Sequence, residues 1–240
     1  MTPDAVARGS KEQATDMETG SIAGGPPTLV LHGVSKRWAG RTVLDEADLV
    51  LERSVSASVI GHNGTGKTTL LRIVAGLILP EAGTIVLDGV RQEDDRREYQ
   101  RRLGYVSSGD GGLYARLKVK QNLEFWAGLA FVAPSQRRAA IERSLARFGL
   151  EPLATRRADR LSLGQRQRVR LAAAFLHEPQ LVLLDEPFSS LDDQGADQLM
   201  AAIRELTGRG GSALACAPAE REGVSFQQAY ILADGGLYPA

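Results

Sequence analysis

Short apolar runs alternate with longer stretches of mixed polarity along most of the chain, which predicts alternating strands and helices. The segments expected to form strands are 28–35, 41–51, 55–61, 84–89, 103–107, 181–185, 212–216 and 229–232. Between about residues 119 and 160 the apolar positions have helical spacing, and Ile141, Leu145 and Phe148 fall on one helix face. Such alternation predicts an α/β fold with a largely parallel sheet.

Two segments depart from simple alternation. Residues 181–185 (LVLLD) are continuously apolar up to a terminal aspartate, as expected of a strand buried on both faces. Residues 91–102 are charged on every side, which predicts a solvated helix.

The composition of the chain argues for some binding partners and against others. The 240 residues carry 29 basic and 29 acidic side chains, and this balance argues against a nucleic-acid partner. Apolar runs fall short of the ~18 residues that cross a bilayer, so a role at a membrane requires a membrane protein as partner. The polar, Gly-rich residues 1–27 predict a disordered tail. The lone Cys216 lies in an apolar run, predicting a buried thiol and a reducing cytoplasm.

A glycine-rich loop carries the strongest chemical signal. Residues 61–68 (GHNGTGKT) follow a predicted strand and precede a predicted helix, the arrangement in which backbone N–H groups surround phosphate oxygens. Lys67 is the expected catalytic contact to the β- and γ-phosphates, and the Thr68 hydroxyl is an expected Mg²⁺ ligand. The predicted phosphate-binding residues are Gly61, His62, Asn63, Gly64, Thr65, Gly66, Lys67, Thr68 and Thr69.

A pair of carboxylates follows the buried strand 181–185. Asp185 at the strand tip is a candidate Mg²⁺ ligand, and Glu186 is the candidate general base that polarises the attacking water. An acidic loop without catalytic function is the simpler alternative for this segment alone, but the upstream phosphate loop favours the catalytic interpretation.

A third motif gives a family resemblance. Residues 161–165 (LSLGQ) precede a predicted helix about twenty residues before Asp185, and residues 188–192 (FSSLD) follow it. With the phosphate loop, they make the chain resemble the ABC ATPases over residues 28–237. The resemblance implies a P-loop NTPase fold with a RecA-like core, an antiparallel β subdomain and an inserted α-helical subdomain. The ATPase domain would span 28–240 and its helical insertion about 113–165.

The resemblance also implies a mechanism and partners. Two domains, identical or different, would face head to tail, and ATP with Mg²⁺ on one would be capped by Ser162, Leu163, Gly164 and Gln165 of the other. Asp192 would organise the dimer seam and Trp38 would stack on adenine. Integral membrane permease subunits would hold the chain at the inner face of the cell membrane. Residues 112–125 resemble exporter-type ATPases paired with ABC-2-type permeases, which implies export.

Three positions depart from the family pattern. Leu163 replaces the first glycine of the signature motif, and Ser108 occupies the place of a glutamine that contacts magnesium and the attacking water. Ser108 or Asp110 could supply an oxygen ligand instead. Pro218 stands where the family has a histidine that binds the γ-phosphate. Losing a polar catalytic group often costs roughly 10²–10³-fold in rate, so slow hydrolysis, or a second ATPase completing one site, is expected.

None of the chain's three histidines supplies the missing group. His32 falls in the first predicted strand, His62 in the phosphate loop, and His177 at the end of the helix after the signature motif. Two alternatives remain open from the sequence: a non-transport ABC ATPase, and a nucleotide-gated assembly or regulatory module that no longer hydrolyses ATP.

Overall fold

The computed structural model describes residues 25–109, 111–217 and 223–240, so nearly all of the predicted tail lies outside it. The strands are β1 (Leu29–Trp38), β2 (Arg41–Leu51), β3 (Ser56–Ile60), β4 (Ala82–Leu87), β5 (Val90–Arg91), β6 (Leu103–Val106), β7 (Leu181–Asp185), β8 (Ser212–Ala217), β9 (Gln228–Ala233) and β10 (Gly236–Pro239). The helices are α1 (Lys67–Val74), α2 (Arg96–Arg101), α3 (Val119–Leu129), α4 (Pro134–Arg147), α5 (Leu163–Phe175) and α6 (Asp193–Gly208), with short 3₁₀ turns at Glu151–Leu153 and Ala158–Arg160.

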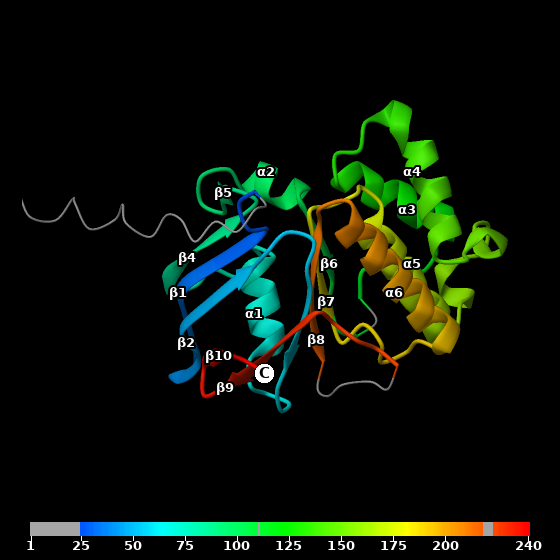
Figure 1. Ribbon diagram of the computed structural model, residues 1–240. Coiled ribbons are helices and arrows are strands. Elements are labelled where there is room, and N and C mark those ends of the chain that lie inside the picture. Colours follow the sequence, from blue (N-terminus) through cyan, green and yellow to red (C-terminus); the bar gives the residue numbers. More distant parts are fainter. Residues whose placement is uncertain (1–24, 110, 218–222) are drawn as a thin grey trace, which may run out of the picture.

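The central sheet has the order β10-β9-β3-β8-β7-β6, and its strands are parallel except for β10. Every residue of β7 is buried, as predicted for a strand covered on both faces. Leu181 and Leu183 belong to the core shared with α1, whereas Val182 and Leu184 belong to the core shared with the helices α3–α6. The parallel strands direct their carboxyl ends to the lower side of the molecule (Figure 1).

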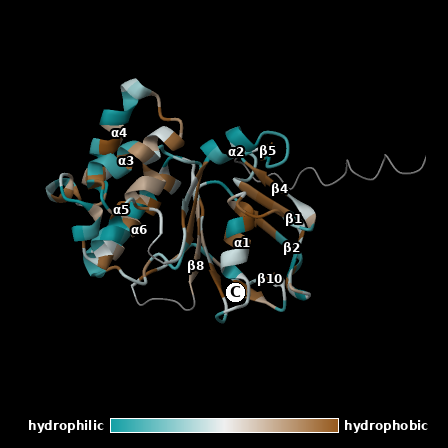
Figure 2. Ribbon diagram, turned by 180° about the vertical axis from the view of Figure 1, so that it is seen from behind, coloured by the Kyte–Doolittle hydropathy of each residue, from teal (hydrophilic) through white to brown (hydrophobic). Residues whose placement is uncertain are grey.

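A second sheet, antiparallel and ordered β2-β1-β4-β5, packs on the other side of α1. Figure 2 shows hydrophobic strands in the interior and more hydrophilic surfaces on the surrounding helices. The predicted α/β fold, with an antiparallel β subdomain and a helical part, is therefore confirmed.

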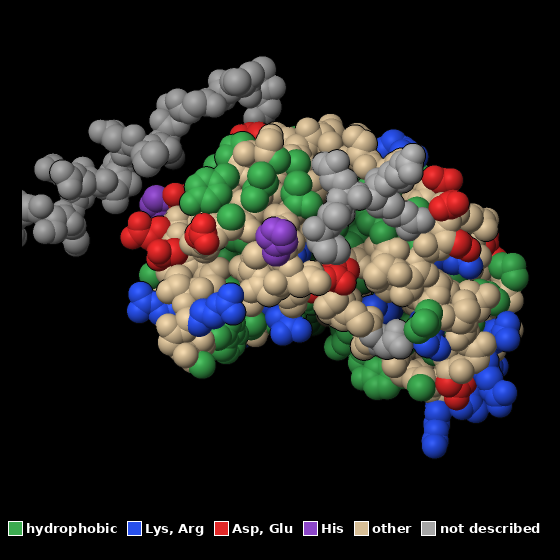
Figure 3. Space-filling model, turned by 90° about the horizontal axis from the view of Figure 1, so that it is seen from below, with side chains coloured by type: hydrophobic (Ala, Val, Ile, Leu, Met, Phe, Trp, Pro, Cys, Tyr) green, Lys and Arg blue, Asp and Glu red, His purple; other side chains and the backbone are tan. Residues whose placement is uncertain are grey.

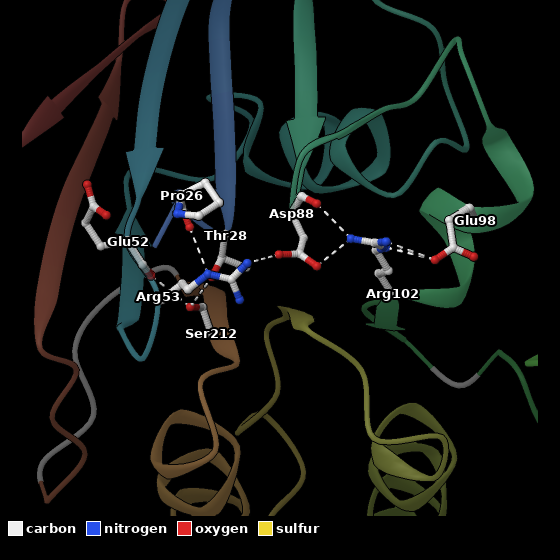
Figure 4. Close-up of polar contacts among 8 residues, drawn as sticks. All are labelled: Pro26, Thr28, Glu52, Arg53, Asp88, Glu98, Arg102 and Ser212. Carbon is white, nitrogen blue, oxygen red and sulfur yellow. Dashed lines mark hydrogen bonds and ion pairs between the residues drawn. The ribbon is translucent and has the colours of Figure 1, made fainter. Parts of the chain in front are cut away.

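A chain of polar contacts joins the two sheets at the end opposite the phosphate loop (Figure 4). Asp88, in the turn between β4 and β5, accepts hydrogen bonds from Arg53 and Arg102, and Arg102 also pairs with Glu98 of α2. Because these partly buried charges are paired, their desolvation is offset, and the antiparallel sheet is tied to the core sheet.

Helices α3, α4 and α5 form a lobe beside the core sheet (Figure 1). The predicted face of Ile141, Leu145 and Phe148 is buried, and Phe148 lies 5.7 Å from Phe175 between ring centroids. Among the described residues, no helix combines the length and apolar character needed to cross a membrane.

The prediction of a solvated helix over residues 91–102 is wrong in two respects. The helix is confined to α2, and Tyr99 within it is fully buried, donating a hydrogen bond from its hydroxyl to Val74 O at 2.7 Å. A single aromatic among charged neighbours gives no periodic pattern, although it anchors α2 on the end of α1.

Candidate nucleotide-binding site

The phosphate loop, residues 61–66, connects β3 to α1 at the lower side of the molecule. Gly64 and Gly66 have φ values of 82° and 111°, a left-handed region that favours glycine. A Cβ atom on Gly66 would lie 2.4 Å from Val43 Cγ1 and 3.0 Å from Val43 O. Both the conformation and the close approach of β2 therefore require glycine at position 66.

Lys67, the first residue of α1, folds back across this loop. Its Nζ donates to Gly61 O at 2.5 Å and to His62 O at 2.8 Å, and the residue is only 6% exposed. The amino end of α1 carries the positive end of the helix dipole. An ammonium group, a helix amino terminus and a glycine loop thus meet at one place, the combination that binds phosphate groups.

Thr68 and Asp185 come together from elements far apart in the sequence. Thr68 Oγ1 donates to Asp185 Oδ2 at 2.9 Å, and Asp185 at the tip of β7 is 1% exposed. Hydroxyl and carboxylate oxygens are hard ligands suited to Mg²⁺, which is usually bound by few protein groups together with phosphates and water. The hydroxyl of Thr68 and the carboxylate of Asp185 are therefore suited to bind a Mg²⁺ ion next to a phosphate group.

Glu186 follows Asp185 in a left-handed conformation, with a φ of 50°. Its backbone N–H donates to Cys216 O at 2.8 Å, which holds the strained residue at the end of β7. Such strain in a residue other than glycine or asparagine persists only where the surroundings enforce it. This contact fixes the backbone of the half-buried Glu186 one residue beyond Asp185.

Cys216 lies on β8 behind these carboxylates. It is fully buried and its Sγ contacts Lys67 O at 3.8 Å. Burial, with a contribution from Asp185, raises the pKa of its thiol well above the usual value. The prediction of a buried thiol is confirmed, and the group is protonated at neutral pH.

The predicted signature residues form the amino end of α5. Ser162 Oγ accepts from the Gln165 N–H at 3.2 Å, and Gln165 Oε1 accepts from the Ser162 N–H at 3.1 Å, a reciprocal capping box. Leu163 is 53% exposed. A Cβ on Gly164 would lie 2.8 Å from Ser190 O, so glycine lets this turn approach the loop after β7.

Two more predicted residues lie at element ends. Trp38 ends β1, is 49% exposed, and has Lys36 Nζ 5.0 Å from its ring centroid. Asp192 caps α6 by accepting the Gly195 N–H at 2.8 Å. The structure thus leaves the Trp38 ring accessible and gives Asp192 a capping contact that the sequence interpretation did not include.

The loop after β6 reaches the same carboxylate. The backbone N–H of Ser108 lies 3.4 Å from Asp185 Oδ2, so Ser108 is at the magnesium side of the site. Arg170 of α5 donates to Ser107 O and to Gly109 O. Sequence reasoning missed Arg170, because it is one of three arginines at alternate positions in this helix, with Arg166 and Arg168, and the pattern does not single it out. Asp110 and Pro218 lie outside the described residues.

The histidines have other surroundings. His32 Nδ1 lies 3.2 Å from Asp48 Oδ1, and His62 is exposed in the phosphate loop. His177 Nε2 donates to Leu103 O at 3.1 Å, and burial lowers its pKa to about 4.

Charges on the face that contains the phosphate loop are mixed. Seen from below, acidic and basic side chains are interspersed among apolar ones (Figure 3). This distribution matches the equal numbers of acidic and basic residues in the sequence.

Comparison with known proteins places these motifs in context. The ABC transporter family matches residues 44–189. The "ABC transporter ATP-binding protein NatA" of Bacillus subtilis is 34% identical over 182 residues, which cover 74% of each chain. The "Molybdenum import ATP-binding protein ModC" of Aromatoleum aromaticum is 35% identical over 79% of this chain and 50% of its own length.

Solved structures show the same fold. One described as "Structure of ATP binding subunit of ABC transporter" superimposes with a TM-score of 0.80 at 26% identity, covering 88% of each chain. The cbiO1 structure from Clostridium perfringens, described as part of the transporter complex cbiONQ, has a TM-score of 0.76 at 23% identity, covering 89% of this chain and 87% of its own. ModC is named for import, so this comparison gives no support to the expectation of export that was based on residues 112–125.

Proposed function

Because the chain belongs to the ABC transporter family of ATP-binding proteins, we propose that two such domains, identical or different, face head to tail and drive a separate membrane permease. The chain is an ATPase that uses ATP and Mg²⁺, and its hydrolysis is coupled to transport. The observation that carries the proposal is a glycine loop held by Lys67, next to the hydrogen-bonded pair Thr68 and Asp185, with a capped signature turn on the same chain.

Within one chain, we assign the phosphates to the loop 61–66 and to Lys67. Mg-ATP supplies the phosphoanhydride bond and the cation that neutralises its charge. Thr68 and Asp185 provide protein oxygens for the cation, and Trp38 provides an exposed ring for adenine. Glu186 accepts the proton of the attacking water, a role supported by its position one residue beyond Asp185 at the strand tip.

The signature turn completes the site of the other subunit. Ser162 Oγ uses one lone pair for its helix cap, and its O–H remains a donor for a phosphate oxygen. Leu163, Gly164 and Gln165 lie in the same first turn, where the helix dipole favours an anion. Asp192 lies at the seam between subunits in this arrangement.

Hydrolysis is slow in our proposal, because a short serine replaces a glutamine at position 108 and a proline replaces the histidine at 218. A second, different ATPase that completes one of the two sites would restore the rate. Turnover of the purified chain, alone and with candidate partner ATPases, distinguishes the two situations.

The permease docks, in this proposal, on the groove beside the edge strand β6. A cavity of about 350 Å³ lies there between the core and the helical lobe, and Leu77 and Leu129, both more than half exposed, line it. An apolar cytoplasmic segment of the permease matches this lining and would hold the chain at the inner face of the cell membrane. Transport direction is left to the permease, since export rests only on the sequence resemblance of residues 112–125.

The test uses Glu186→Gln beside the wild-type chain. We expect the variant to bind Mg-ATP and to form a dimer with it, while single-turnover phosphate release falls roughly 10²–10³-fold. Arg143→Ala, at an exposed position on α4, is the matched control and should behave as wild type. Failure of the wild-type chain to bind Mg-ATP, or hydrolysis by Glu186→Gln at the wild-type rate, would contradict the assignment.

A further inference from the structure

We infer that Arg170 and Gln167 of α5 are positioning residues that hold the loop after β6 and the tip of β7 in place around the magnesium side of the site. The inference rests on the proposed function, because it concerns the same nucleotide site. Through these two residues, α5 connects two parts of the molecule. One is the signature turn, which would touch the partner's nucleotide, and the other is the set of residues that would bind this chain's own magnesium.

Arg170 lies on the buried side of α5, with only 8% of its surface exposed. Its guanidinium donates to the backbone oxygens of Ser107 and Gly109 and, at 3.0 Å, to Ser107 Oγ. A buried cation is costly unless such acceptors surround it. The planar fork of arginine can reach several carbonyl groups at once, so it fixes the path of the loop as well as its distance from α5.

The loop that Arg170 holds is the one that meets Asp185. Between Ser107 and Gly109, the Ser108 N–H points to Asp185 Oδ2 at 3.4 Å, and the same carboxylate accepts from Thr68. Because the side chain of Ser108 is short, the loop contacts the site through the backbone N–H of this residue. Movement of the loop therefore changes the surroundings of Asp185 directly.

Gln167, one helical turn before Arg170, reaches the other side of the same strand tip. Its Nε2 donates to Pro187 O at 3.1 Å, and its Oε1 accepts from Arg170 Nη1 at 2.8 Å. Pro187 follows Glu186, the proposed base. The hydrogen bond between Gln167 and Arg170 fixes both side chains, so α5 holds the two segments that flank Asp185 through one connected pair.

The helix itself makes this arrangement a mechanical link. Ser162 at the amino end and Arg170 are separated by roughly 12 Å along the axis, at about 1.5 Å per residue. A helix of this length moves as a rigid element. A partner nucleotide that shifts the turn at Ser162 would therefore shift the loop at Ser107–Gly109 and the residue after Glu186 together.

The experiment compares Arg170→Ala and Arg170→Lys with wild type and with Arg143→Ala. The first readout is amide hydrogen exchange of residues 103–109 in the chain without nucleotide, which does not depend on hydrolysis. We expect at least roughly tenfold faster exchange in Arg170→Ala, with α4 unchanged. The lysine variant should recover only part of the protection, because a single ammonium reaches fewer carbonyl groups.

The second readout is the Mg²⁺ concentration that gives half-maximal ATPase activity. We expect this concentration to rise, or kcat to fall, about 10–100-fold in Arg170→Ala, as for loss of a group that orients a metal ligand, while KM for ATP stays within about threefold. The hydrogen bonds of Arg170 given above go to Gln167 and to the loop after β6, whereas most of the affinity for ATP would come from the phosphate loop.

The outcomes separate the two proposals. If folded Arg170→Ala shows wild-type exchange of residues 103–109 and an unchanged Mg²⁺ requirement, the inference is wrong and the proposed function stands. If Arg170→Ala does not fold, the same comparison is made with Arg170→Lys and Gln167→Ala, and wild-type values for both again overturn the inference. A wild-type chain that does not bind Mg-ATP overturns the proposed function and the inference together.

Discussion

The phosphate loop and the signature turn both lie at the amino end of a helix, but they differ in whether side chains already cap the backbone N–H groups of that end. Gly66 precedes α1 without a side chain that could cap it, so the amide groups there are left for a ligand. Ser162 and Gln165 cap α5 reciprocally. One helix end is built to be completed by phosphate, and the other is already stable before any partner arrives.

The two regions also differ in how many elements contribute to them. Val43 of β2 approaches Gly66 of the phosphate loop, and Asp185 of β7 accepts a hydrogen bond from Thr68 just after it, so the geometry of this region depends on both sheets. The signature turn contacts the segment after β7 and otherwise presents the exposed Leu163. The first is a site that one chain assembles by itself, whereas the second, in the proposed function, acts only against another subunit.

The largest effect is expected at the self-contained region. Lys67→Ala removes the ammonium that now contacts Gly61 O and His62 O, and we expect kcat/KM for ATP to fall roughly 10²–10³-fold. ATP titration and phosphate release measure it. Lys120→Ala, at an exposed position on α3, is the control. Equal activity of Lys67→Ala and wild type would remove the distinction between the two helix ends.

The signature turn should respond differently, because its role needs a second subunit. Ser162→Asp keeps a good capping oxygen but places a negative charge where a phosphate would approach. We expect the free energy of unfolding to stay near wild type and ATP affinity of the single chain to be unchanged. Hydrolysis should fall roughly 10–100-fold, as for a lost hydrogen bond to a charged group. Hydrolysis equal to wild type would show that the turn does not contact nucleotide.

The far end of α5 offers a pH test of how the helix is attached. Burial lowers the pKa of His177 to about 4, so the folded chain holds the ring neutral while the unfolded chain takes up a proton near the usual value of 6.5. Stability is therefore complete above pH 6.5 and falls as the pH decreases toward 4. Between pH 6.5 and 5 the loss is roughly 1.6 kcal/mol.

Denaturant unfolding at several pH values measures this loss, and His177→Phe is the matched variant that cannot titrate. The average slope between pH 6.5 and 5 should be smaller in the variant by about 1 kcal/mol per pH unit. An identical slope in the two proteins would mean that burial does not lower the pKa of His177 in the folded chain.

Much of this architecture follows from local pattern. The buried strand β7 was predictable because both of its faces are apolar, and the helical lobe because its apolar positions repeat at helical spacing. The edge strand β10 was missed, since Gly236–Pro239 is short and ends in proline. Its pairing with β9 is decided by the preceding turn, in which Asp234 and Gly235 both have positive φ.

The candidate site, like the fold, has some residues that the sequence locates and some contacts that it does not. Motif spacing located Lys67, Thr68 and Asp185 because each has a fixed place at the end of a predicted element. In the structure Thr68 contacts Asp185, and Lys67 folds back on the phosphate loop. Arg170 and the backbone of Ser108 were not predictable as contacts, because they meet across 61 to 77 positions of sequence without a periodic signal. A helix interior and a loop have to be folded before their proximity is visible.

The smallest expected effect concerns Asp192. This residue caps a helix within its own chain and, in the proposed function, also lies at the contact between subunits. As the cap of α6 it holds the Gly195 N–H, so Asp192→Ala should cost about 1 kcal/mol of unfolding free energy, whereas Asp192→Ser keeps the cap and should cost less. Dimer formation with Mg-ATP, measured in the Glu186→Gln background, then tests the seam. If Asp192→Ser dimerises as well as the parent, Asp192 is a helix cap and nothing more; weaker dimerisation at equal stability assigns it to the subunit contact.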